Sequence, residues 1–298
     1  MSTYDIDELK EQMCEVGRRI WLRGFCAGNE GNHSARIGED RFLCTPTGVS
    51  KGFLTPDDIC VVDGEGNQVE PNANGRKRTS EVLVHLAIYR KRPDVNAVIH
   101  SHPPHAVAFC IAGMPLPEGV HPEAEVFLGK VPIAQYATPG TPKLSESILP
   151  LIGPETNTIL MGNHGSVTFS PDIIDTYYRL EILDNYCRQL LLARQLGNVN
   201  VLNAQQMVEL LKVKQKFGFE DARLACAADG CVGTENQPFL APFDVRPSSA
   251  SCGCDASGVA TGAAQRHSVG GGQAAADADD EAFEQLVQLI TDQIMATR

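Results

Sequence analysis

Apolar positions recur with a helical period in four stretches of the chain. Over residues 5–23 they fall close to 3.6 residues apart, which predicts an amphipathic helix; they are Ile6, Leu9, Met13, Val16, Ile20 and Leu22. Residues 78–93 (RTSEVLVHLAIYRKRP) predict a second helix, which starts near Thr79 or Ser80 and stops before Pro93. Residues 171–196, rich in Leu, Ile and Tyr, and residues 205–217 predict two more helices.

Short apolar runs closed by turn residues predict strands between these helices. The runs are RFLCTPTG (41–48), DICVVDGEGN (58–67), NAVIHSH (96–102), KVPIAQYA (130–137) and NTILMGNHGSVTF (157–169). Pro103-Pro104 ends the third run, and another helix begins within residues 105–113. Because several connections look like hairpins, we expect an α/β layered domain with a largely antiparallel sheet.

The pattern changes after about residue 224. Residues 225–278 are rich in Gly, Ala, Ser and Asp and lack a sustained apolar period, which predicts a flexible linker or disorder. A helical period returns in residues 279–298, where the apolar positions are Phe283, Leu286, Val287, Ile290 and Ile294. The predicted organisation is therefore a domain over 1–224, a linker over 225–278 and an amphipathic helix over 279–298.

Charge and composition exclude several classes of partner. The chain of 298 residues carries a formal net charge of −12, which disfavours non-specific binding to nucleic acid or to an anionic membrane. No segment reaches the roughly 18–20 apolar residues of a membrane span, and the acidic N-terminus lacks the apolar core of a secretory signal. We therefore expect a cytoplasmic protein, with its scattered cysteines reduced and mostly buried; these are Cys14, Cys26, Cys44, Cys60, Cys110 and Cys187.

Three histidines are candidate metal ligands. His100 and His102 lie two positions apart on a predicted strand, so their side chains share a face. Taken alone, the pair is also compatible with ordinary strand histidines near a turn. His164, directly after another apolar strand, adds a third imidazole, and three neutral imidazoles with one open position make a catalytic zinc site. We interpret His105 as lying behind these ligands or on the surface; His33 and His85 are interpreted as structural.

Glu81 is the candidate acid–base group. It lies near a predicted helix start, where a glutamate usually just interacts favourably with the helix dipole, but Thr79 and Ser80 lie beside it. Hydroxyls and free N–H groups at a helix start suit a phosphate, and the stretches 31–34 (GNHS) and 46–48 (PTG) offer more small residues. The chain matches neither a P-loop nor a GxGxxG fingerprint, so nucleotide binding is not indicated.

Taken in order, GNHS, TPTGVSKG, TSE, HSHPPH, YATPGT and MGNHG resemble the class II aldolase/ribulose-phosphate epimerase family over roughly residues 5–220. The resemblance implies a three-layer αβα sandwich, a homotetramer and one Zn²⁺ per subunit at a subunit interface. It implies zinc ligands at His100, His102 and His164, and an acid–base group at Glu81 that can also approach the metal when no substrate is bound. The implied phosphate-binding residues are Asn32, Thr47, Gly48, Thr79 and Ser80.

The activity implied by the resemblance is cleavage of L-fuculose 1-phosphate or L-rhamnulose 1-phosphate to dihydroxyacetone phosphate and L-lactaldehyde. Related aldolases use tyrosines on the aldehyde part, but this chain has Phe217 near the domain end and Glu123 in HPEAEVFLG. Glu123 is therefore a tentative proton donor. Pentulose-5-phosphate 4-epimerase and sugar-phosphate dehydratase activities remain alternatives. A non-enzymatic, adducin-like interaction module is disfavoured because the three histidines and Glu81 are all present.

The end of the chain resembles an encapsulation peptide of bacterial microcompartment enzymes. Such a helix, here 279–298, would bind shell proteins or neighbouring cargo in the microcompartment lumen, where a reactive aldehyde product is retained. The alternatives are a helix that packs back on its own tetramer and a generic oligomerisation tail. Four further cysteines lack the spacing of a zinc ribbon, and their role, including a metal or redox site, stays open; they are Cys226, Cys231, Cys252 and Cys254.

Overall fold

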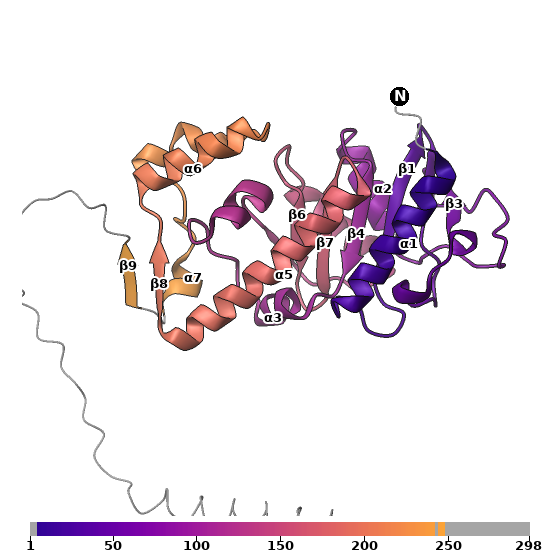
Figure 1. The fold of residues 1–298 in the computed structure, drawn as a ribbon, viewed down its shortest axis with the longest axis horizontal. Coiled ribbons are helices and arrows are strands. Elements are labelled where there is room, and N and C mark those ends of the chain that lie inside the picture. The colour runs from indigo at the N-terminus through magenta and orange to yellow at the C-terminus, as the bar shows by residue number, and fades with distance from the viewer. Residues whose placement is uncertain (1–4, 242–243, 248–298) are drawn as a thin grey trace, which may run out of the picture. The chain divides into compact units, whose positions relative to one another are not determined.

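A seven-stranded sheet forms the centre of the protein (Figure 1). The computed structural model describes residues 5–241 and 244–247. The strand order is β3-β2-β1-β4-β7-β6-β5, and all neighbours pair antiparallel except β5 and β6. The strands are β1 (Asn32–Gly38), β2 (Arg41–Cys44), β3 (Cys60–Val62), β4 (Ala97–Ser101), β5 (Ile133–Ala134), β6 (Thr158–Met161) and β7 (Gly165–Ser170).

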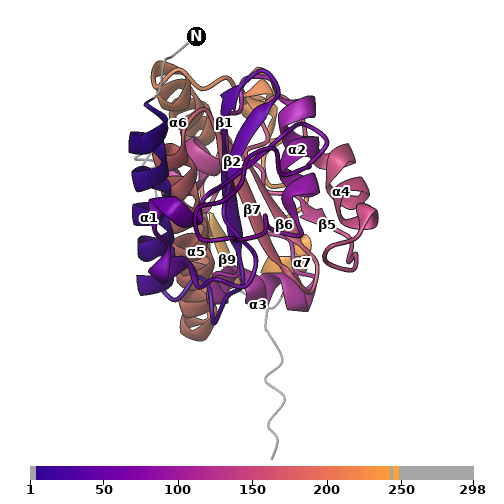
Figure 2. The same ribbon diagram turned by 90° about the vertical axis from the view of Figure 1, so that its right-hand side faces the viewer.

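Helices cover both faces of this sheet. The described α-helices are α1 (Ile6–Leu22), α2 (Val82–Lys91), α3 (Pro104–Ala112), α4 (Pro142–Ile148) and α5 (Ile173–Leu196), which pack around the sheet, and α6 (Ala204–Lys216) and α7 (Gln237–Leu240), which follow them in the chain. Figure 2 shows α1 and α5 on one side of the sheet and α2 and α4 on the other. The three-layer αβα class predicted from the sequence is confirmed, as are the four predicted long helices.

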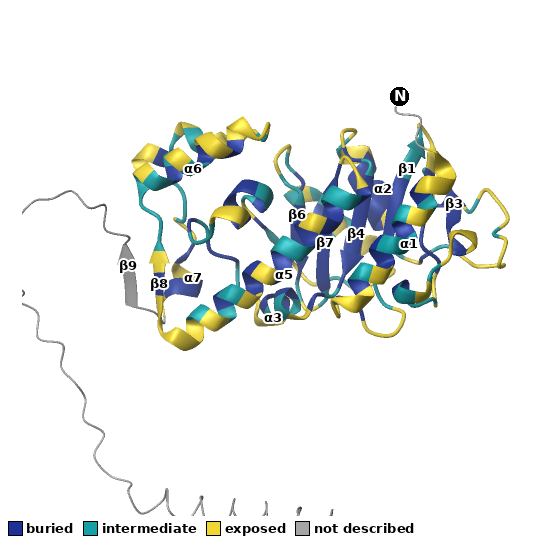
Figure 3. Cartoon of the chain, viewed as in Figure 1, coloured by how far each residue is buried: buried dark blue, intermediate teal, exposed yellow. Residues whose placement is uncertain are grey.

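Two apolar clusters explain the layers. Leu9, Met13, Val16 and Ile20 are the buried positions of the predicted period in α1, and they pack with Tyr177 and Leu180 of α5 over one face of the sheet. On the other face, α2 and α4 pack against strand residues such as Val98 and Val167. Figure 3 shows the strands and the inner helix faces as buried. Burial of these stripes supplies the main driving force for the fold.

After α5, more of the chain is ordered than the sequence predicted. Residues 198–241, here called the C-terminal extension, contain β8 (Asn198–Val201), α6, two 3₁₀ turns (Ala222–Ala225 and Ala227–Asp229) and α7. β8 pairs in parallel with β9 (Asp244–Pro247). The linker prediction does not hold for residues 225–241, since Phe239 is buried in the same cluster as Leu183 and Leu190 of α5.

The physical reason for this difference is that the extension depends on tertiary contacts that composition does not register. Asn236 is 4% exposed, accepts a hydrogen bond from the N–H of Glu118 and donates one to the Glu118 carbonyl. A disulfide joins Cys226 to Cys231. The other six cysteines within the described part are free, and five of these are buried, as predicted.

The predicted linker residues 248–278, the predicted helix 279–298 and the pair Cys252 and Cys254 lie outside the described residues. Within the part that the structure describes, no helix combines the length and the apolar character that a membrane span requires.

Candidate metal centre and active site

Three imidazoles converge where the central strand β4 ends and its neighbour β7 begins. His100 lies in β4, His102 follows that strand directly, and His164 lies in the turn between β6 and β7. Their ring centroids are 4.9, 4.7 and 5.1 Å apart, and one ring nitrogen of each lies within 4.8 Å of the others. The Nε2 atoms of His100 and His102 are 3.1 Å apart. The structure therefore brings together the three histidines singled out in the sequence.

The turn before β7 carries His164 to the other two histidines. β4 and β7 pair antiparallel, so the start of β7 meets the end of β4. Asn163 adopts a left-handed backbone conformation (φ 54°) that makes the turn tight. Gly165 is required by close approach, because a Cβ there would lie 2.6 Å from Cδ2 of His102.

Hydrogen-bond acceptors orient two of the rings. Nδ1 of His100 donates to the carbonyl oxygen of Ser166 over 2.9 Å, which leaves the lone pair on Nε2. Nδ1 of His102 lies 2.7 Å from a carboxylate oxygen of Glu30. Both rings therefore turn Nε2 toward the cluster, the arrangement that metal-binding histidines adopt when a second group holds the opposite nitrogen.

Burial keeps this cluster suited to metal binding. It lowers the pKa of His100 well below the ordinary value, and the neighbouring His102 and His164 add to the effect. Burial likewise lowers the pKa of His164. Metal ligation requires the neutral imidazole, so an environment that disfavours the imidazolium favours ligation.

Glu81, the residue directly before α2, faces the histidine cluster. Its Oε2 lies 3.3 Å from Nε2 of His100, and its Oε1 lies 3.9 Å from Nε2 of His164. The side-chain amide of Asn32 donates to Oε2 over 2.9 Å. Oε1 is buried without a hydrogen-bond partner. A buried carboxylate oxygen in this position needs a partner, and a metal ion or a substrate proton would supply one.

The donor set fits a divalent transition metal. Three imidazole nitrogens with space for a further ligand are typical of catalytic sites for zinc and similar ions. The unpartnered Oε1 of Glu81, 3.9 Å from Nε2 of His164, agrees with this interpretation. His100, His102 and His164 would hold the ion, and Glu81 could approach it.

The predicted phosphate-binding residues lie on segments next to Glu81. The N–H of Thr47 donates to the carbonyl of Lys77, and the N–H of Thr79 donates to the carbonyl of Thr45. These two bonds, of 2.9 and 3.1 Å, hold the Thr47–Gly48 turn beside the segment that carries Thr79.

Gly48 and Thr79 shape the backbone of this region. Gly48 has a φ of +74°, a conformation that a side chain disfavours, so the turn depends on glycine. Thr79 is buried and its hydroxyl accepts from the N–H of Glu81, whereas Ser80 is exposed. Asn32 lies opposite His100 in the pairing of β1 with β4, which places its amide between the histidine cluster and this region.

The three other histidines considered in the sequence, His33, His85 and His105, lie outside the cluster, as expected. Nε2 of His33 lies 2.9 Å from the carbonyl of Met13, and Nδ1 of His85 lies 2.7 Å from the hydroxyl of Ser34. Both rings are fully buried, and burial lowers the pKa of each to about 3. His105, at the start of α3, is 2.8 Å from the carboxylate of Asp184 through Nδ1.

The structure does not connect Glu123 or Phe217 to the histidine cluster within this subunit. The carboxylate of Glu123 is 60% exposed and lies 3.3 Å from Nδ1 of His121. Phe217 caps the C-terminal end of α6 and is 62% exposed, with its ring 6.2 Å from that of Phe127. Glu123 as a proton donor therefore stays a prediction.

Sequence reasoning missed two charged residues near the site. Glu30 orients His102, and Lys51 is 1% exposed. The Lys51 ammonium donates to the carbonyls of Asn29 and Val49, which ties the loop before β1 to the turn after β2, and burial lowers its pKa to about 8. The only signal was position, since Lys51 lies inside the TPTGVSKG motif and Glu30 directly precedes the GNHS motif.

Comparison with known proteins settles the family. Residues 11–191, more than half of the chain, match the family described as "Class II Aldolase and Adducin N-terminal domain". The chain belongs to this class II aldolase family. Its members are generally metal-dependent, which agrees with the histidine cluster, and lyase activity is consistent with membership.

Curated relatives within the family carry two different names. An "L-fuculose phosphate aldolase" of Methanocaldococcus jannaschii is 35% identical over 183 residues, 61% of this chain and 96% of that protein. A "3-oxo-tetronate 4-phosphate decarboxylase" of Haemophilus influenzae is 33% identical over 181 residues, 59% of this chain and 83% of that protein. The chain is thus similar to one protein named as an aldolase and to another named as a decarboxylase.

Solved structures show the same division. An "L-fuculose 1-phosphate aldolase" superposes with a TM-score of 0.64 at 27% identity, covering 71% of this chain and 97% of the other. YgbL of Klebsiella pneumoniae, described as a putative aldolase/epimerase/decarboxylase, superposes with a TM-score of 0.61 at 28% identity, covering 69% and 98%. These class II aldolase structures match the fold described above.

Proposed function

We propose that this class II aldolase-family protein is a zinc-dependent aldolase that cleaves L-fuculose 1-phosphate or L-rhamnulose 1-phosphate to dihydroxyacetone phosphate and L-lactaldehyde. The observation that carries the proposal is the cluster of His100, His102 and His164 beside the Glu81 carboxylate, which lies 3.3 Å from Nε2 of His100 and 3.9 Å from Nε2 of His164. The 35% identity to the fuculose phosphate aldolase of Methanocaldococcus jannaschii supports this choice of substrate class.

The bound metal would supply a Lewis acid for the negative charge that develops on the substrate oxygens. Glu81 would handle the proton at carbon. When the C3–C4 bond of the ketose phosphate breaks, C3 of the dihydroxyacetone phosphate fragment must gain a proton, and in the reverse direction it must lose one. The Glu81 carboxylate, held by the amide of Asn32 over 2.9 Å, is positioned for this transfer.

The phosphate would bind at the turns beside Glu81. Thr47, Thr79 and Ser80 offer hydroxyls there, Gly48 and Ser80 offer backbone N–H groups, and Asn32 offers its amide. Binding of the phosphate, which does not react, would hold C3 of the substrate at a fixed distance from Glu81. Contacts remote from the reacting carbon accelerate a reaction by such positioning.

A second candidate is decarboxylation of a 3-oxo-acid phosphate. Retro-aldol cleavage requires a base for the C4 hydroxyl proton, whereas loss of CO₂ from 3-oxo-tetronate 4-phosphate requires none. Both reactions leave the same dihydroxyacetone phosphate fragment, to be protonated at carbon. The exposed Phe217, where related aldolases use a tyrosine, and the 33% identity to the Haemophilus influenzae decarboxylase favour this candidate.

A product assay separates the candidates. The purified full-length protein, loaded with Zn²⁺, is incubated with each of the two deoxyketohexose 1-phosphates and with 3-oxo-tetronate 4-phosphate. Release of dihydroxyacetone phosphate together with lactaldehyde supports the aldolase, and release together with CO₂ supports the decarboxylase. Turnover of a pentulose 5-phosphate by epimerisation, or loss of water from a sugar phosphate, without either release would overturn both.

Assembly and location belong to the same proposal. The family resemblance supports a homotetramer, which light scattering after gel filtration would test. The helical period of residues 279–298 supports binding to microcompartment shell proteins or cargo. A fluorescent protein fused to residues 270–298 should form puncta only when shell proteins are co-expressed, and a diffuse signal in their presence would contradict the targeting proposal.

A further inference from the structure

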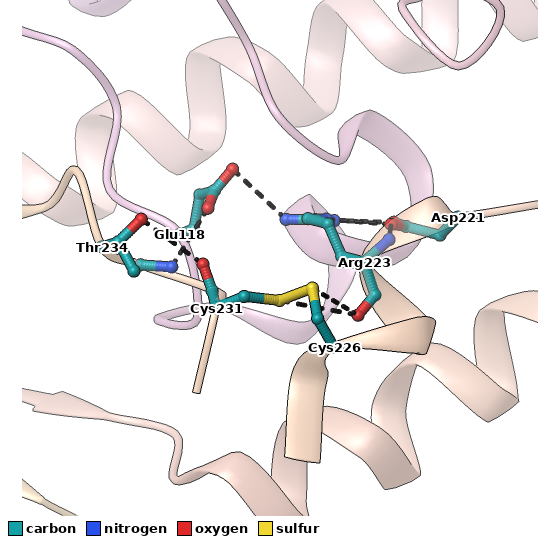
Figure 4. Close-up of a disulfide and its surroundings, with 7 residues drawn as sticks. Glu118, Asp221, Arg223, Cys226, Cys231 and Thr234 are labelled. Carbon is teal, nitrogen blue, oxygen red and sulfur yellow. Dashed lines mark hydrogen bonds and ion pairs between the residues drawn. A yellow bond between two sulfur atoms is a disulfide. The ribbon is translucent and has the colours of Figure 1, made fainter. Parts of the chain in front are cut away.

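The disulfide between Cys226 and Cys231 is the one covalent cross-link in the described part of the chain (Figure 4). The two cysteines are five positions apart, and both are half-buried, so solvent reaches this loop. The disulfide lies after residue 191, the last residue of the family match. No step of the proposed reaction uses it.

The six free cysteines of the described residues are poorer sites for thiol chemistry. Five are buried, and burial raises the pKa of Cys44 to about 12 and that of Cys110 to about 11. Cys14 is half-buried, but burial also raises the pKa of its thiol to about 11. Since thiol–disulfide exchange needs a thiolate and an accessible sulfur, the pair in the C-terminal extension is the favoured site of exchange.

The disulfide holds two apolar anchors of the extension. Ala227 follows Cys226 in the chain and is 1% exposed, where it packs with Met207 and Leu211 of α6. Val232 follows Cys231 and packs against the same cluster. This cluster is small, so the free energy of docking α6 depends strongly on the loop that presents these two residues.

An ion network lies directly beside the cross-link. The guanidinium of Arg223 donates to both carboxylate oxygens of Asp221 over 2.9 and 2.7 Å, and it lies 3.0 Å from Glu125 and 3.4 Å from Glu118. Lys214 of α6 donates to Asp221 over 2.8 Å. Asp221 and Arg223 therefore link α6 to residues 118–125, and the 226–231 loop follows them closely in the chain.

We propose that Cys226 and Cys231 form a reversible thiol–disulfide exchange site that controls how firmly α6 and residues 222–232 are held. The reductant is a small thiol or a protein dithiol. Its thiolate attacks one sulfur, the other sulfur leaves as a thiolate, and a second thiol resolves the mixed disulfide. In sum, two thiols are oxidised to one disulfide, and Cys226 and Cys231 each gain one electron and one proton.

The reduced state also has a hydrogen-bond acceptor in place. The carbonyl oxygen of Arg223 lies 3.6 Å from the sulfur of Cys226 and 3.7 Å from that of Cys231 (Figure 4). Two thiols at these positions could donate to it. Reduction therefore removes the covalent constraint without leaving a buried polar group unsatisfied, as a reversible site requires.

The chemical half of the proposal is tested on the full-length protein in glutathione buffers of graded reduced-to-oxidised ratio. After alkylation, peptide mapping should show the 226–231 disulfide in oxidised buffer and two alkylated cysteines in reduced buffer, interconverting without denaturant. Failure to form this disulfide in oxidised glutathione would overturn the proposal. A disulfide that yields only after unfolding would also overturn it, because that result describes a permanent cross-link.

The conformational half is tested by hydrogen exchange. In the reduced protein, amides of residues 204–232 should exchange about tenfold faster or more than in the oxidised protein, while those of β4 stay unchanged. The double variant Cys226→Ser/Cys231→Ser should resemble the reduced protein in both buffers. The matched control Cys252→Ser/Cys254→Ser should keep the wild-type response. Equal exchange in the two redox states would contradict the proposal.

Discussion

The histidine cluster and the C-terminal extension are stabilised in different ways. The cluster lies at the ends of two central strands of a seven-stranded sheet. Helices bury continuous apolar stripes on both faces of this sheet. The extension has a small apolar cluster on α6, together with the Arg223 ion network and one disulfide. A site on a rigid sheet can keep its geometry when one side chain changes, whereas the extension depends on a few apolar anchors, such as Phe239 against α5, together with its polar contacts.

The largest effect is expected at the cluster. His102→Ala removes one of the three proposed metal ligands, and it should lower kcat by at least about 10³-fold and reduce the zinc content measured by mass spectrometry. The fold, followed by circular dichroism, should not change. His105→Ala is the matched control, because His105 bonds to Asp184 outside the cluster. Full activity of the His102 variant without metal would contradict the proposed site.

Glu81→Gln should lower kcat by roughly 10²- to 10⁴-fold, since the amide keeps the shape but cannot carry the proton. Exchange of the dihydroxyacetone phosphate C–H proton with deuterated water, followed by NMR, should slow in parallel. Zinc content, measured on the same sample, separates loss of the proton carrier from loss of metal. Unchanged proton exchange would show that another group performs the transfer.

Arg223→Met tests the extension. It leaves the carboxylates of Asp221, Glu118 and Glu125 close together and without their shared cation. Such a loss costs roughly 3–5 kcal/mol of stability. Chemical denaturation should show this loss, and limited proteolysis should cut first within 198–241. The control Arg18→Met removes an exposed ion pair with Glu15 and should leave the midpoint of chemical denaturation unchanged. An equal shift of the midpoint in both variants would contradict the special role of the Arg223 network.

Asp221 gives the extension a specific dependence on pH. Burial alone would raise the pKa of Asp221, but hydrogen bonds from Arg223 and Lys214 outweigh it and lower the pKa from 3.8 to about 2. Because the folded value is the lower one, the contribution is complete above pH 4 and is lost as the pH falls toward 2. It amounts to about 2 kcal/mol.

The variant Asp221→Asn isolates that contribution. The difference in stability between wild type and variant, from denaturation at each pH, should be largest at neutral pH and shrink between pH 4 and 2. Subtracting the two curves removes the effects of other carboxyl groups, including Glu125, whose pKa burial raises. A difference that stays constant over this range would show that the Asp221 charge contributes nothing.

The smallest effect is expected at Glu30, which contacts His102 on the side away from the other two histidines. Glu30→Gln keeps a hydrogen-bond acceptor for Nδ1 of His102 but removes the charge. Zinc affinity, measured by competition with a chelator, should fall by about tenfold. If affinity falls as far as in His102→Ala, Glu30 does more than orient the ring.

The sequence predicted the histidine cluster well because its signal is local. Two histidines two positions apart on a strand must share a face, and His164 follows an apolar strand. Glu30 and Lys51 gave no such signal, because their roles arise from contacts between loops. The order in residues 225–241 was missed because Gly- and Ala-rich composition hides anchors such as Phe239, whose burial depends on α5.

The sequence by itself determined the periodic elements and the αβα class and singled out the three clustered histidines, because each depends on side-chain spacing along one segment or on a short ordered motif. Only the tertiary structure decided which nitrogen of each ring faces the cluster, where Glu81 lies, and that the extension folds back on α5. These features depend on distances between segments far apart in the chain. Burial and hydrogen bonding at those contacts, rather than local propensity, fix them.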